Sequence, residues 1–112
     1  MADHIVITKA AQRYRVRAGD TVLGETAAAL VVQEAGHGPV IYVPRGDMDM
    51  ALLEPTQRQT SCPWKGAASY YSVKTPGGVL ANVIWSYEAP KADVAAIAGH
   101  LAFYPAVTVE AV

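Results

Sequence analysis

Short runs in which apolar and polar side chains alternate recur along this chain. Such alternation is typical of strands that have one face in a core and the other in water. It predicts strands over residues 5–8, 13–17, 21–25, 27–34 and 40–43. The run 27–34 is ambiguous, because its three alanines favour helix whereas Leu30, Val31 and Val32 suit a buried strand. We favour the strand, because a turn containing Gly36 and Gly38 follows at once.

The clearest supersecondary pattern is a β-hairpin in the second half of the chain. Two β-rich runs, residues 69–75 and 79–87, flank a turn that contains two glycines. The stretch from Thr60 to Tyr71 is expected to be a loop that enters the first of these strands at about Ala68. A last extended segment, residues 103–109, is expected to close the chain.

Two helical segments are predicted. Asp47 can act as the N-cap of one or two helical turns between Met48 and Leu53. A C-terminal helix of about three turns is expected after Pro90, because apolar residues follow it at helical spacing. These residues are Val94, Ile97, Ala98 and Leu101.

Seven or eight short strands separated by turns predict a mainly β fold of compact antiparallel sheets, with a short helical turn and one C-terminal helix. With 112 residues the chain has the length of one ordinary domain, so residues 1–112 are expected to form a single domain. Hydrophobic residues make up 52% of the chain and charged residues 17%, which is typical of a globular protein.

Charge and cysteine content narrow the range of partners. Nine Lys and Arg against ten Asp and Glu leave a formal charge of −1, which gives no electrostatic reason to expect nucleic acid or an anionic membrane as partner. No segment approaches the ~20 apolar residues of a membrane span and no basic leader begins the chain, so we expect a cytoplasmic protein. The single cysteine, Cys62, cannot form an intramolecular disulfide or a cysteine-based zinc site, and no metal or cofactor is expected. The apolar excess and short edge strands favour a homodimer.

The densest chemistry lies between residues 60 and 71, where Cys62 and Lys65 are three residues apart. An ammonium held beside the thiol would favour the thiolate, which would make Cys62 a nucleophile or a redox-sensitive group. The alternative is an inert cysteine that packs as a small hydrophobic residue, with Lys65 solvated or paired with a carboxylate.

A second candidate group combines Glu34, Arg45 and Asp47 with Lys65, all at predicted strand ends or in loops. The two cations would bind an anionic ligand while one of the carboxylates acts as a general base. The alternative is a set of salt bridges that fixes the loops, with Asp47 serving only as a helix cap.

A third candidate group is aromatic. Trp85 and Tyr87 are two residues apart on one predicted strand and share a face, and Tyr70 on the partner strand can lie opposite them. These rings would line a pocket for a planar ligand, or they would form an ordinary core face whose phenol groups reach the surface.

Four motifs along the chain, in this order, closely resemble a family described as domain of unknown function 427. They are Tyr42-Val43-Pro44-Arg45-Gly46-Asp47-Met48, Cys62-Pro63-Trp64-Lys65-Gly66, Trp85-Ser86-Tyr87-Glu88-Ala89-Pro90 and Ala102-Phe103-Tyr104. The resemblance extends from about Arg13 to Val109. It implies a compact β-rich domain, similar to the β-tent folds, for which no biochemical activity is established.

The family has been given a nucleotidyltransferase label, which calls for clustered carboxylates that hold Mg²⁺ and a phosphate-binding glycine loop. Here the close acidic pair is Asp47 and Asp49, and Gly77-Gly78 belongs to a predicted hairpin turn.

Two classes of function therefore stay open. One is a module, with or without catalytic activity, that binds a small anionic or planar molecule near the Cys-Pro-Trp-Lys-Gly segment. The other is a structural or self-associating interaction domain without catalysis. A concave pocket bordered by Cys62, Lys65, Glu34 and Trp85 would favour the first class, and a filled core in which these groups satisfy one another would favour the second.

Overall fold

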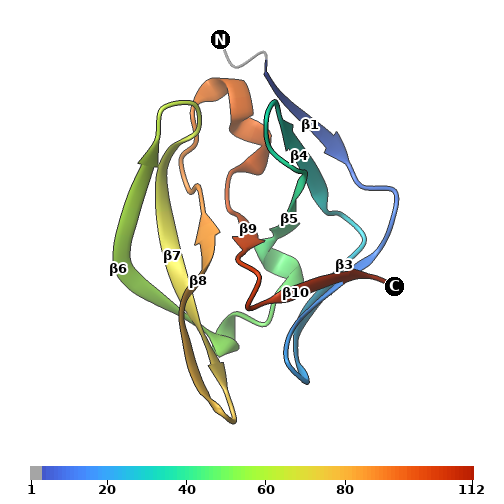
Figure 1. The fold of residues 1–112 in the computed structure, drawn as a ribbon, viewed down its shortest axis with the longest axis vertical. Helices are drawn as coiled ribbons and strands as arrows, with labels where there is room; N and C mark the ends of the chain where they lie inside the picture. Colours follow the sequence, from blue (N-terminus) through green and yellow to red (C-terminus); the bar gives the residue numbers. More distant parts are fainter. Residues whose placement is uncertain (1–3) are drawn as a thin grey trace.

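The computed structural model describes residues 4–112; the first three residues of the predicted domain lie outside the described residues. Within this part of the chain, ten strands form two antiparallel sheets (Figure 1). No helix between residues 4 and 112 is long and apolar enough to cross a membrane.

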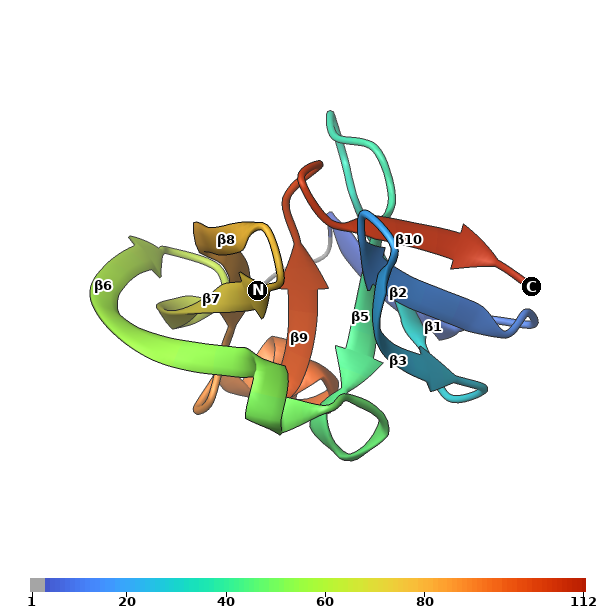
Figure 2. The ribbon, with the colours of Figure 1, turned by 90° about the horizontal axis from the view of Figure 1, so that it is seen from below.

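The larger sheet contains seven strands in the spatial order β1-β4-β5-β9-β8-β7-β6, and every neighbouring pair is antiparallel. Its strands are β1 (Ile5–Lys9), β4 (Leu30–Glu34), β5 (Val40–Pro44), β6 (Leu53–Cys62), β7 (Gly66–Thr75), β8 (Gly78–Ser86) and β9 (His100–Phe103). The smaller sheet has the order β10-β2-β3, with β2 (Tyr14–Ala18), β3 (Thr21–Thr26) and β10 (Thr108–Ala111). Figure 2 shows the smaller sheet lying beside β5, away from β6 and β7.

Alternation along β8 shows how the larger sheet contributes to two cores. Ile84 is fully buried in a cluster with Val43 and Leu101 and with Val16 of the smaller sheet. Trp85, the next residue, packs against a different cluster, because successive side chains of a strand point to opposite faces. The second cluster is rich in aromatic residues and carries the candidate site.

The ladder between β5 and β9 is short. It contains two residue pairs, Val43 with Leu101 and Pro44 with His100, both at the C-terminal end of β5. The first residues of β5 pair on their other edge with β4. The larger sheet is therefore joined at its centre by only a short ladder.

The predicted strands in the first half of the chain are confirmed, including the ambiguous run, which forms β4. The predicted hairpin is also confirmed as β7 and β8, with Gly78 at a φ of +128°, a conformation that favours glycine. The last extended segment, predicted over residues 103–109, is confirmed only in part: Phe103 ends β9, residues 104–107 lie outside the strands, and β10 begins at Thr108.

The loop predicted from Thr60 to about Ala68 is shorter in the structure and is limited to residues 63–65. Strand β6 continues to Cys62 and β7 begins at Gly66, so this stretch contains two strand ends and a tight turn. Most of β6 is exposed and polar, because it is the edge strand of the sheet. An edge strand with polar residues on both faces lacks the alternation on which the prediction depended.

Both helical predictions need correction. Residues Met50–Leu52 form one turn of 3₁₀ helix whose N-cap is Asp49, not Asp47; the Asp49 side chain accepts a hydrogen bond from the Ala51 backbone N–H at 3.2 Å. The C-terminal α-helix is not confirmed. Residues Ala92–Ile97 form a 3₁₀ segment with a kink at Val94, where φ is −126°.

The apolar spacing that predicted the C-terminal helix has another structural cause. Val94 and Ile97 reach the aromatic-rich core from the 3₁₀ segment, whereas Leu101 lies in β9 and faces the other core. Gly99, with a φ of +69°, separates the two elements. A helical repeat in the sequence is thus divided between two elements that bury their residues in different clusters.

Candidate functional site

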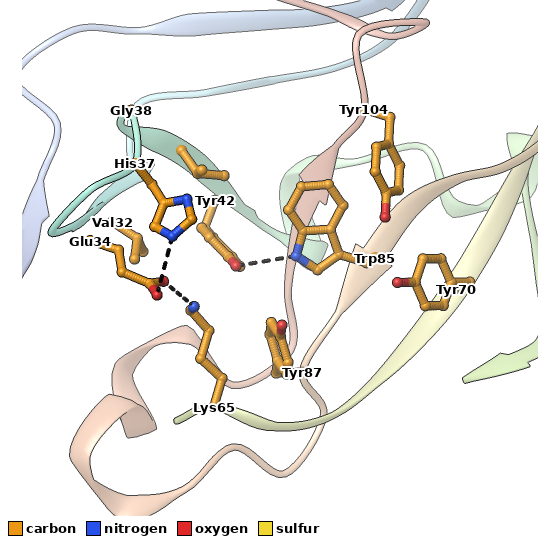
Figure 3. A pocket seen from close by; sticks show the side chains of 11 residues that line it. Val32, Glu34, His37, Gly38, Tyr42, Lys65, Tyr70, Trp85, Tyr87 and Tyr104 are labelled. Carbon is orange, nitrogen blue, oxygen red and sulfur yellow. Dashed lines mark hydrogen bonds and ion pairs between the residues drawn. The ribbon is translucent and has the colours of Figure 1, made fainter. Parts of the chain in front are cut away.

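A pocket of about 260 Å³ opens on the aromatic face of the larger sheet (Figure 3). Five aromatic side chains line it, and we call it the aromatic pocket; they are Tyr42, Tyr70, Trp85, Tyr87 and Tyr104. Polar side chains from β4 and from the turns that follow β4 and β6 close one end; they are Glu34, His37 and Lys65. Val32, Gly38 and Val40 complete the lining.

Strand register places three of these aromatic residues together. Tyr70 of β7 lies directly opposite Trp85 of β8, and Tyr87, just beyond the end of β8, lines the same pocket. The structure thus brings together the predicted group of Tyr70, Trp85 and Tyr87 along one pocket.

Tyr42 and Trp85 make the most specific contact within the pocket. The indole Nε1–H of Trp85 donates a hydrogen bond to the Tyr42 hydroxyl at 3.2 Å, and the two rings lie edge to face at 6.4 Å between centroids. The indole of Trp85 also packs against the ring of Tyr104, with a centroid distance of 4.8 Å. These contacts fix the orientation of the indole, because both its N–H and one of its faces are occupied.

The polar end of the pocket is an ion pair. Nζ of Lys65 lies 2.6 Å from Oε1 of Glu34, and the two side chains are only 10% and 21% exposed. The other Glu34 oxygen, Oε2, lies 3.8 Å from His4 and 3.9 Å from His37. The hydrogen bond from Lys65 lowers the pKa of Glu34 below its ordinary value, although partial burial opposes this effect.

The Cys-Pro-Trp-Lys-Gly segment is the turn between β6 and β7, with Cys62 paired to Gly66. Lys91 attaches this turn to the segment before the 3₁₀ helix: its backbone N–H donates to the Lys65 carbonyl at 2.9 Å and its Nζ to the Pro63 carbonyl at 2.6 Å. Gly66 has a φ of +108°, a conformation that L-residues rarely adopt. The backbone of Lys65 is therefore held in place on both sides.

Cys62 does not line the pocket. It is half-buried and packs against the core cluster that contains Tyr42 and Tyr87. Of the four residues expected to border a ligand pocket, Glu34, Lys65 and Trp85 line this one. The fourth, Cys62, packs against core side chains instead.

Arg45 and Asp47 lie away from the Lys65–Glu34 pair. Glu34 lies beyond the N-terminal end of β5, since Val32 pairs with Val40, whereas Arg45 follows the C-terminal end of the same strand. Arg45 forms an ion pair with Glu88, and its guanidinium lies 5.6 Å from the ring centroid of Tyr71.

Asp47 has a structural partner. Its Oδ2 accepts a hydrogen bond from the buried Thr26 hydroxyl at 2.7 Å. Of the four residues predicted to form one charged group, only Glu34 and Lys65 therefore meet.

Three of the four phenols of the pocket have a pKa above the ordinary value; for Tyr70 burial acts in the same direction, but hydrogen bonds, first that with Thr60, lower its pKa. Burial raises the pKa of Tyr42 to about 12, and it also raises the pKa of Tyr87. The hydrogen bond that Tyr104 makes with Tyr70 raises the pKa of the Tyr104 phenol. Each of these hydroxyls can therefore donate one hydrogen bond and accept others.

Sequence reasoning did not select Tyr42, Tyr104 or His37 as site residues. Tyr42 had a usable signal, because it alternates with Val40 on a predicted strand and so shares the face of that residue. Tyr104 and His37 follow strand ends, where sequence periodicity does not fix the direction of a side chain. Within residues 4–112, no group of three or more His, Cys, Asp or Glu side chains is arranged to hold a metal ion.

The family model described as a domain of unknown function, DUF427, matches residues 6–112. The chain therefore belongs to this family, as its four motifs predict. A search of curated proteins finds no match to this chain.

Proposed function

We propose that this domain binds a small, planar, uncharged molecule in the aromatic pocket. The observation that carries the proposal is the Tyr42–Trp85 hydrogen bond, which sets a polar group among aromatic faces in a pocket of about 260 Å³. Pockets that combine aromatic walls with a few fixed polar groups are typical of small-molecule sites. The rings would stack against a flat ligand while the hydroxyl groups select its orientation.

The Tyr42 hydroxyl is the preferred donor to such a ligand. Its oxygen accepts the Trp85 N–H, so its own proton is free to be donated to a carbonyl or a ring nitrogen. Because burial raises the pKa of Tyr42 to about 12, this hydroxyl stays protonated over the physiological range.

An uncharged ligand fits the pocket better than the anion that the sequence suggested as one alternative. The charge of Lys65 is matched by Glu34 at 2.6 Å, and Arg45, the second expected cation, is paired with Glu88 at the far end of β5. An anion would have to separate the Lys65–Glu34 pair and leave a carboxylate that is 21% exposed without its main partner.

In this proposal Lys65 positions Glu34, and Cys62 packs in the core next to the pocket. No reaction is therefore assigned to Lys65 or to Cys62. A structural or self-associating domain is the second candidate. It is favoured by one observation: Lys65 and Glu34 satisfy each other without a ligand.

Thermal-shift and calorimetric screening with uncharged heteroaromatic compounds tests the proposal. Compounds that bind the wild type are expected to bind Tyr42→Phe about three- to tenfold more weakly, which corresponds to one lost hydrogen bond. Tyr14→Phe, in β2 of the smaller sheet, is the matched control and should bind as the wild type does. If no compound binds, or if Tyr42→Phe binds every compound as well as the wild type, the second candidate is preferred.

A further inference from the structure

A second hollow of about 260 Å³ lies next to the aromatic pocket, and its lining is apolar. Six of its lining residues belong to it alone, and we call it the apolar groove; they are Pro39, Ile41, Phe103, Pro105, Val107 and Val109. They come from the turn before β5, from β5, β9 and β10, and from the loop between β9 and β10, so the groove lies where the two sheets approach each other.

The aromatic pocket and the apolar groove share two walls. Trp85 and Val40 line both of them. Residues adjacent in sequence also line the two hollows. Gly38 lines the pocket and Pro39 the groove, and likewise Tyr104 lines the pocket and Pro105 the groove. Figure 3 shows Trp85 between Gly38 on one side and Tyr104 on the other.

The short ladder between β5 and β9 explains why the two hollows share lining residues. The strands pair at Val43 with Leu101, but no pair follows between Ile41 and Phe103, which would be the next on that face if the ladder continued. The sheet therefore opens at this place, and the space is bordered by Trp85 on the pocket side and by Phe103 on the groove side.

We propose that the two hollows form one bipartite site for an amphipathic molecule, with a planar, hydrogen-bonding head in the aromatic pocket and an apolar arm in the apolar groove. This inference rests on the proposed function, which supplies the head. The occupant of the groove follows from the two lining residues that it shares with the pocket, Trp85 and Val40, and from the absence of a charged side chain among the described residues that line it. An apolar arm would gain up to about fourfold in affinity for each methylene that it buries.

A matched pair of probes tests the proposal: 4-hydroxybenzamide, which has the head alone, and N-butyl-4-hydroxybenzamide, which adds a four-carbon arm. Calorimetric titration of the wild type is expected to show about ten- to a hundredfold tighter binding of the butyl compound, since immobilising the arm offsets part of the gain. The head compound should bind all groove variants as it binds the wild type.

Val109 is half-buried and lines the groove alone. Substitutions there should change binding of the arm without changing binding of the head. Val109→Phe fills the groove and should abolish the gain from the butyl arm; Val109→Thr, which keeps the shape of the side chain and adds a hydroxyl, should reduce it by about threefold. Val79→Thr is the control, because Val79 is 62% exposed at the β7–β8 turn.

Three results would overturn the proposal. If the butyl compound binds the wild type no more tightly than 4-hydroxybenzamide, the groove takes no arm, although the proposed function stands. If the gain survives in Val109→Phe protein whose circular dichroism matches the wild type, the arm lies elsewhere. If neither compound binds the wild type, the bipartite site is overturned; the proposed function fails with it only if no heteroaromatic compound binds either.

Discussion

Lys65 and Glu34 form an ion pair with Nζ 2.6 Å from Oε1, although 31 residues separate them along the chain. The pair joins the β6–β7 turn to the end of β4, two elements at nearly opposite ends of the larger sheet's strand order. Both side chains are largely removed from water, and the pair closes one end of the aromatic pocket.

Loss of this pair should destabilise the protein. Lys65→Met keeps most of the aliphatic stem but leaves the Glu34 carboxylate without its main partner, so the free energy of unfolding should fall by about 2 kcal/mol. Urea denaturation measures this change. Lys74→Met, on an exposed residue of β7, is the control and should change stability by less than about 0.5 kcal/mol.

The double variant Glu34→Gln/Lys65→Met completes the cycle. Removing both charges leaves no uncompensated ion, so the double variant should be more stable than Lys65→Met alone. Equal stability of the two would mean that the pair contributes nothing beyond the packing of Lys65.

The same pair predicts how stability depends on pH. Lys65 lowers the pKa of Glu34 in the folded state below its ordinary value of 4.5, so the stabilisation is fully present above that value and is lost as pH falls through the folded pKa. The stability difference between the wild type and Glu34→Gln should be constant near neutral pH and shrink below about pH 4.5.

Thermal denaturation at a series of pH values gives this comparison. Glu54→Gln, at an exposed position of β6, is the matched control and should show a small difference at every pH. A difference between the wild type and Glu34→Gln that grows on acidification would contradict the assignment.

A third prediction concerns the junction between the sheets at Gly24. A Cβ atom at Gly24 would lie 2.4 Å from the Asp47 carbonyl oxygen and 2.9 Å from Sδ of Met48. Gly24→Ala should therefore force β3 away from this segment and lower the free energy of unfolding by about 1–3 kcal/mol. At Gly46 a Cβ would meet nothing within 4 Å, so Gly46→Ala should be nearly neutral in the same denaturation experiment.

Much of the fold follows from local patterns in the sequence. Alternating or β-branched runs separated by turn residues predict β1 to β5 and the β7–β8 hairpin. The pattern fails for β6, whose polar residues lie on an exposed edge, and for Leu101, whose spacing from Ile97 is helical although it belongs to β9. Strand β6 pairs with β7, the next strand along the chain, and β9 pairs with the distant strand β5 and with β8; local periodicity does not contain these pairings.

The candidate site can be predicted only in part from the sequence, again because strand pairing is not contained in local periodicity. Trp85 and Tyr87 both line the pocket because they are two residues apart, Trp85 in β8 and Tyr87 just beyond its end, and the sequence shows this spacing directly. Lys65 pairs with Glu34 because the β6–β7 turn lies near the end of β4. Arg45 is separated from both because it follows the opposite end of β5. The order of the strands in the sheet determines these contacts, and the spacing of residues along the chain does not reveal that order.

The two tryptophans provide the most direct test of the aromatic pocket. The Trp85 indole N–H contacts Tyr42 inside the pocket, whereas Trp64 is 43% exposed on the β6–β7 turn and packs edge-on against His4. In ¹⁵N-edited NMR spectra, each compound that stabilises the wild type should shift the Trp85 indole cross-peak more than that of Trp64. Stabilising compounds that leave the Trp85 cross-peak unchanged would contradict the assignment of this pocket as the ligand site.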